Sequence, residues 1–93
     1  MQEEKLLKII NNYGVMHQLK YFQSEIFELN EAIILEQYDE DSIEHIAEEI
    51  ADVEVMLLQF KEYYHIDGNL ILEIMNKKID RQLGRIENEQ FKE

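Results

Sequence analysis

Cysteine and proline are both absent from this 93-residue chain, and glycine occurs only three times. Without cysteine, neither a disulfide nor a thiolate metal site can stabilise the fold. The scarcity of proline and glycine favours long, uninterrupted helices. A domain of this size buries only roughly 60–65% of the surface that its unfolded chain exposes, so self-association is the remaining common source of stability.

Long apolar segments and basic residues are also scarce. No apolar run approaches the ~18–20 residues of a membrane-spanning helix, and no signal-peptide pattern opens the sequence, so we expect a cytoplasmic protein with no membrane partner. Nine Lys and Arg stand against 21 Asp and Glu, giving a formal net charge of −12. This charge argues against nucleic acid as a main partner, because binding a phosphate backbone requires clustered cations. The charge does not exclude a small phosphorylated substrate, but such a substrate needs metal ions to screen it from the acidic side chains of its binding site.

Apolar residues recur at spacings of three and four, which predicts four helices and no strands. We place the helices at about residues 3–11, 15–37, 42–65 and 70–88. The apolar stripes of the last three helices are Leu19, Phe22, Ile26, Leu29 and Ile33; Ile43, Ile46, Ile50, Val53, Leu57 and Phe60; and Leu72, Met75, Ile79, Leu83 and Ile86. Because a short link joins the two long central helices, we expect them to pack antiparallel in one all-α domain of the four-helix-bundle type.

One pattern occurs twice, at residues 24–33 and again at residues 48–57. Each copy carries two carboxylates three residues apart: Glu25 and Glu28 in the first copy, Glu49 and Asp52 in the second. Residues at this spacing lie on one side of a helix, with Cβ atoms about 5–6 Å apart. Four carboxylates brought together by two helices need a cation, since like charges otherwise raise each other's pKa. Oxygen-only ligands favour Mg²⁺ when the substrate carries phosphate, with Mn²⁺ as a possible substitute.

Both carboxylate pairs lie on the same border of the apolar stripe. On a helical wheel at about 100° per residue, Glu25 falls about 70° and Glu28 about 130° from the centre of the stripe. Glu49 and Asp52 take equivalent angles on the third helix. We therefore expect all four at the border of the core. Periodicity alone does not exclude the alternative, in which these are solvated charges at the edge of the core that repeat by accident.

Candidate substrate-binding residues lie on the second and fourth helices. Lys78, Arg81 and Arg85 form one basic face at spacing i, i+3, i+7. Lys78 and Arg81 are candidate contacts to the outer oxygens of a polyphosphate. The alternative is that they pair with surface acids or interact with the helix dipole, and for Arg85 we favour this alternative. Before the first carboxylate pair, Gln18 could read a base edge and His17 could stack on a base. An ordinary surface or packing role is the alternative for both.

The ordered set Glu25-x-x-Glu28 and Glu49-x-x-Asp52 resembles the MazG-like all-α nucleoside triphosphate pyrophosphohydrolases over about residues 15–86. The stretches at residues 29–33 and 48–53 are similar to that family as well. The resemblance implies a MazG-like four-helix fold assembled as a homodimer or homotetramer. It also implies Mg²⁺-dependent hydrolysis of an NTP or dNTP to the monophosphate and pyrophosphate. Carried over by position, the four carboxylates are metal ligands, and Glu25 or Glu28 orients the attacking water. The family form has two consecutive glutamates where this chain has Ser24 and Glu25.

Two other functions fit parts of the sequence. A non-catalytic helical interaction module, including a degenerate MazG-like protein, would use the apolar stripes as its core and dimer seam. A di-iron carboxylate bundle needs two Glu-x-x-His motifs, whereas the chain has one, from Glu62 to His65, at a helix end. We therefore predict a nucleotide pyrophosphohydrolase, with the interaction module as the alternative.

Overall fold

A computed structural model describes residues 1–91, and these residues are all-α. The four helices are α1 (Gln2–Tyr13), α2 (Val15–Gln37), α3 (Ile43–Tyr63) and α4 (Gly68–Phe91). The prediction of four helices without strands is confirmed for the described residues. Among them, no helix combines the length and the apolar character that crossing a membrane requires.

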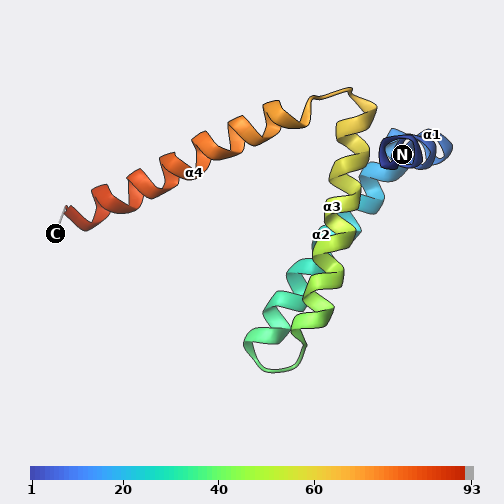
Figure 1. Cartoon of the computed structure of the whole chain (residues 1–93). Coiled ribbons are helices and arrows are strands. Elements are labelled where there is room, and N and C mark those ends of the chain that lie inside the picture. Colours follow the sequence, from blue (N-terminus) through green and yellow to red (C-terminus); the bar gives the residue numbers. More distant parts are fainter. Residues whose placement is uncertain (92–93) are drawn as a thin grey trace.

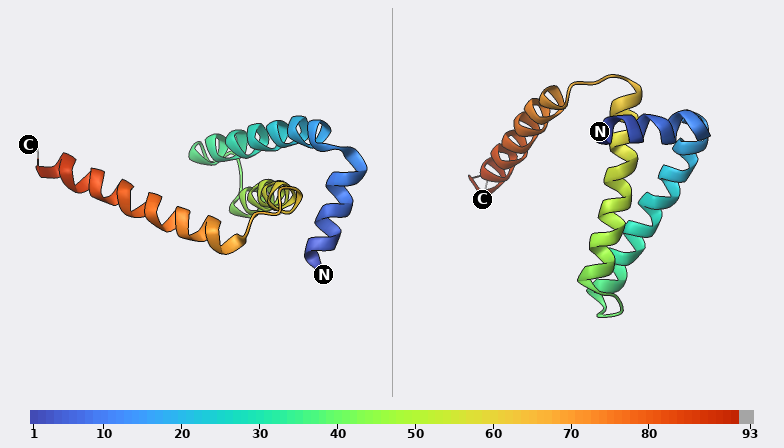
Figure 2. Two further views of the ribbon diagram at one scale, coloured as in Figure 1. Left: turned by 90° about the horizontal axis from the view of Figure 1, so that it is seen from above. Right: turned by 45° about the vertical axis from the view of Figure 1, so that its right-hand side comes forward.

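The two central helices form the antiparallel hairpin that the short link predicts, and α1 crosses the end of the hairpin where α2 begins (Figures 1 and 2). Gly14 makes the sharp turn between α1 and α2 with a positive φ of 90°, a region that glycine enters without a Cβ clash. The buried apolar core is small, and it consists of Leu6, Ile10, Ala32, Val53 and Met56.

The fourth helix extends away from the other three in every view (Figures 1 and 2). Its five predicted core positions, from Leu72 to Ile86, are between 49% and 54% exposed. The bundle within one chain is therefore built from α1, α2 and α3. The start of α4 adjoins the end of α3, where Leu72 and Met75 line a shared cavity with Leu57 and Leu58, and the apolar face of α4 is about half-exposed.

The α2–α3 contact also differs from the predicted one. Much of the expected apolar stripe is exposed, with Ile26, Ile33 and Ile50 at 42–43% and Leu57 at 51%. The buried face of the hairpin lies to one side of that stripe and carries polar residues, among them Glu25 and Glu49. The expectation that these carboxylates lie at the border of the core is wrong for these two residues. The small Ala32, 1% exposed, is buried on the same face of α2 as Glu25, where its size allows close packing.

Candidate metal centre

The α2–α3 hairpin brings one carboxylate of the first repeat together with both carboxylates of the second. Glu25 comes from α2, and Glu49 and Asp52 lie one turn apart on α3. Each offers a carboxylate oxygen, and the three oxygens lie within 4.8 Å of one another. The two sequence repeats therefore meet as a three-carboxylate group because their helices run antiparallel.

Two members of this group are buried and incompletely paired. Glu25 is 5% exposed and Glu49 is 8% exposed. The Oε2 atom of each is buried and has no hydrogen-bond partner. An ionised carboxylate in this state is costly unless a cation pairs with it. Asp52 is exposed and forms the solvent side of the group. The donor set, all oxygen and two-thirds buried, fits a hard divalent cation such as Mg²⁺.

The electrostatics of Glu25 indicate the same need for a cation. Burial raises the pKa of the Glu25 carboxyl, and the charges of Asp52 and Glu28 raise it further, while the Tyr21 hydroxyl opposes the shift. The Glu25 carboxylate in turn raises the pKa of the Tyr21 hydroxyl, which favours the neutral phenol. A bound cation would reverse the balance at Glu25 by favouring its charged form.

The fourth predicted ligand, Glu28, lies outside this group. It is exposed on α2, one turn beyond Glu25, and it lines a cavity of about 330 Å³ together with Glu49 and His45. Ser24, which replaces the usual glutamate of the resembled family, is also exposed, and its hydroxyl donates to the Lys20 carbonyl at 3.5 Å.

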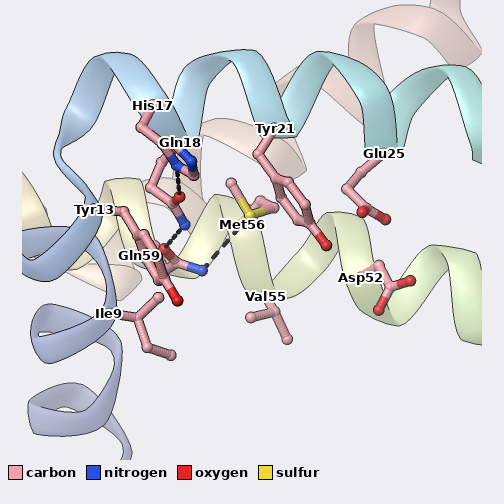
Figure 3. Close-up of a pocket in the computed structure, with 10 residues that line it drawn as sticks. All are labelled: Ile9, Tyr13, His17, Gln18, Tyr21, Glu25, Asp52, Val55, Met56 and Gln59. Atoms are coloured by element: carbon pink, nitrogen blue, oxygen red, sulfur yellow. Dashed lines mark hydrogen bonds between the residues drawn. The ribbon is translucent and has the colours of Figure 1, made fainter.

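A cavity of about 410 Å³ adjoins the three-carboxylate group between α1, α2 and α3 (Figure 3). Glu25 and Asp52 lie at one end, and Ile9 and Tyr13 lie at the other. The remaining lining residues are mostly apolar, aromatic or amide side chains: His17, Gln18, Tyr21, Val55, Met56 and Gln59. The cavity is thus an apolar space with polar groups at defined points, which is typical of a small-molecule site.

Both predicted base-contacting residues line this cavity. Gln18 is buried, and its Nε2 donates to Gln59 Oε1 at 2.8 Å. The Gln18 Oε1 lies 2.8 Å from His17 Nδ1, and the His17 ring stacks on Tyr13 with centroids 5.1 Å apart. The sequence interpretation missed Gln59, whose Nε2 donates to the Met56 sulfur at 3.6 Å. Its position seven residues after Asp52, on the same helical face, is the signal that could have found it.

The predicted phosphate contacts are not brought to the carboxylates within one chain. Lys78 and Arg81 are exposed on α4, which extends away from the hairpin (Figure 1). The position of α4 depends on the turn after α3, where His65 has a positive φ of 54°. A helical wheel places both residues on one face but does not predict the direction of the whole helix.

No protein-family model, curated protein or solved structure matches the chain. The resemblance to MazG-like enzymes therefore depends on the two carboxylate pairs and the short stretches of sequence beside them.

Proposed function

We propose that the protein is a divalent-metal-dependent pyrophosphohydrolase that converts an NTP or dNTP to the monophosphate and pyrophosphate. One observation supports this most directly. Glu25 and Glu49, each buried with an unpaired oxygen, converge with Asp52, and Glu25 and Asp52 stand at the end of a 410 Å³ cavity. A site of this composition takes Mg²⁺, with Mn²⁺ as a substitute, and the adjoining space takes the base and sugar.

The residues divide into three groups by the part of the substrate they meet. Glu25, Glu49 and Asp52 hold the cation that binds the phosphate chain. Glu28, outside this group, is left as the carboxylate that orients the attacking water. A bound Mg²⁺ supplies charge stabilisation and lowers the pKa of a coordinated water. The amides of Gln18 and Gln59 hold the base edge, and His17 stacks on the base beside Tyr13.

The exposed apolar faces support assembly of two or four copies. Two apolar faces are about half-exposed in one chain: the face of α4 and the stripe through Ile26, Ile33, Ile50 and Leu57. Contiguous exposed apolar surface of this kind marks a protein interface. Charge is compatible with the same pairing, because α2 and α3 together carry ten acids and two lysines, whereas the four cations of α4 balance its four acids.

A homodimer in which α4 of each copy covers the hairpin of the other accounts for these faces. In this arrangement Lys78 and Arg81 of one copy approach the three-carboxylate group of the other, where they contact the outer phosphates. A homotetramer is then a pair of such dimers.

The test is pyrophosphate release from a panel of NTPs and dNTPs, with Mg²⁺ or with EDTA. We expect metal-dependent release that Asp52→Asn lowers by at least about 100-fold, because a ligand charge is lost while the shape is kept. Glu54→Gln, an exposed acid on the same helix, is the matched control and should keep activity. Absence of release from every nucleotide, with helicity and oligomer intact, would contradict the proposal.

The exposed apolar faces also favour a second candidate, a non-catalytic helical association module. In that case the carboxylate variants assemble normally and no nucleotide is hydrolysed by any of them. The same assay, run beside a measurement of molar mass, separates the two functions.

A further inference from the structure

A chain of three polar side chains links the start of α3 to the three-carboxylate group. His45 and Glu49 lie four residues apart on one face of α3, and Asp41 lies four residues before His45, just ahead of the N-cap of the helix. His45 Nδ1 lies 2.8 Å from both carboxylate oxygens of Asp41. On its other side, His45 Nε2 lies 3.1 Å from Glu49 Oε1. The imidazole thus stands between the partly buried carboxylate of Asp41 and the buried one of Glu49.

The helix cap fixes the first members of this chain. Ser42 is the N-cap of α3, and its hydroxyl accepts a hydrogen bond from the His45 backbone N–H at 3.1 Å. The Ser42 backbone N–H donates to Asp41 Oδ1 at 2.7 Å. Because carboxylates only accept, each ring nitrogen donates where it meets Asp41 or Glu49. Asp41 is therefore held by the backbone, and His45 is held by Asp41.

The two oxygens of Glu49 have different surroundings as a result. Oε1 is occupied by His45, whereas Oε2 is buried without a partner. A carboxylate held through one oxygen cannot swing freely, so the other oxygen keeps its direction. This is the support that hydrogen bonds commonly give to metal-binding side chains, whose loss costs about 10–100-fold in metal affinity.

We propose that His45, held by Asp41, is a positioning residue that orients Glu49 so that its Oε2 binds the metal ion. The inference rests on the proposed function, because it assigns a role at the same metal centre. A merely structural role is the alternative, since two i, i+4 pairs also stabilise the first turns of a helix. Electrostatics alone predicts the opposite effect on the metal, because a positive imidazole beside the site repels a cation.

The experiment measures Mn²⁺ affinity of the full-length chain by electron paramagnetic resonance of free Mn²⁺, without nucleotide. His45→Leu removes both donors and should weaken Mn²⁺ binding by about 10–100-fold. His45→Gln keeps an N–H that can reach Glu49 and should stay within about threefold of the unaltered chain. Asp41→Asn, which weakens the hold on His45, should fall between the two. Glu44→Gln, which removes an exposed acid in the same turn, is the matched control.

Unchanged or tighter Mn²⁺ binding in His45→Leu, with or without a loss of thermal stability, would overturn the inference and leave the metal centre intact. Equal weakening in both His45 variants would also overturn it, because the retained N–H would then have no effect. Asp41→Asn gives the decisive comparison if far-UV circular dichroism shows that His45→Leu is unfolded. A chain that binds no Mn²⁺ at millimolar concentration contradicts the proposed function itself, and that result is distinguishable from failure of the positioning role alone.

Discussion

Glu25 is subject to opposite requirements from folding and from metal binding. Its carboxylate is 5% exposed, one oxygen lacks a partner, and burial raises the pKa of the group. Keeping such a group ionised without a cation costs folding free energy, whereas the same unpaired oxygen is what a metal ion needs. The buried charge of Glu25 is thus suited to a metal-binding site, but it destabilises the metal-free fold.

We therefore expect Glu25→Gln to stabilise the metal-free protein while it weakens metal binding. At neutral pH in EDTA, the free energy of unfolding should rise by about 1–2 kcal/mol, because a neutral amide replaces a poorly paired charge. Urea denaturation followed by circular dichroism measures this difference. Glu31→Gln, on an exposed position of the same helix, should change stability by less than about 0.5 kcal/mol.

The pH dependence of the Glu25→Gln effect has a defined sign. The pKa of Glu25 is higher in the folded state than in the unfolded state, so the destabilisation is complete above the folded pKa. It diminishes as pH falls through that value and disappears below the unfolded pKa. The stability difference between the two proteins should therefore close in acid. A gap that widens as pH falls would mean that the Glu25 carboxylate is stabilised in the fold, contrary to this account.

At the scale of elements, spacing of apolar residues predicts the helices but not which face each one buries. The 3–4 spacing and the rarity of glycine determine α2 and α3 locally. The choice of contact face depends on tertiary packing, and the two candidate faces lie only about 70° apart on the helix. In one chain the polar face beside Ala32 is buried and the stripe through Ile26 stays exposed.

The candidate site was also only partly predictable from the sequence. The repeated carboxylates gave a direct signal for Glu25, Glu49 and Asp52, because a charge pair beside an apolar stripe is recognisable in sequence. The Gln59 amide gave only a weak signal, its place seven residues after Asp52 on the same face of α3, since a single uncharged polar residue leaves no periodic pattern. Glu28 follows the same pattern as the other three carboxylates, yet lies outside the group. This could not be predicted, because the register of two packed helices cannot be derived from the sequence of either helix alone.

The amide pair between α2 and α3 allows a test of that register. Gln18 and Gln59 are both buried and share a 2.8 Å hydrogen bond. Replacing either one with leucine leaves the facing group of the other, Gln18 Nε2 or Gln59 Oε1, buried without its partner, so each single variant should lose about 1–3 kcal/mol of stability. The double variant should lose much less than the sum, because it removes both groups of the shared hydrogen bond together. Additive losses in urea denaturation would show that the two amides do not interact.

At the scale of the whole molecule, one chain exposes more apolar surface than its small core can balance. The core contains five buried apolar residues, while the stripe of the hairpin and the face of α4 are half-exposed. The molecule extends over 54 × 37 × 23 Å because α4 lies apart from the hairpin. An isolated amphipathic helix derives most of its stability from burying its apolar face, so α4 needs a partner surface to be stable in water.

Complementation between two inactive variants tests whether that partner is a second copy and whether it completes the site. Asp52→Asn removes a metal ligand, and Arg81→Ala removes the proposed phosphate contact. In a mixed dimer, the hairpin of the Arg81→Ala chain keeps all its carboxylates and receives Arg81 from the Asp52→Asn chain. Random mixing gives half mixed dimers with one complete site each, so pyrophosphate release should recover to about one quarter of the unaltered rate. If Arg81 acted within its own chain, mixing would restore no activity. If no second copy covered the α4 face, Ile79→Glu would leave the molar mass in solution unchanged.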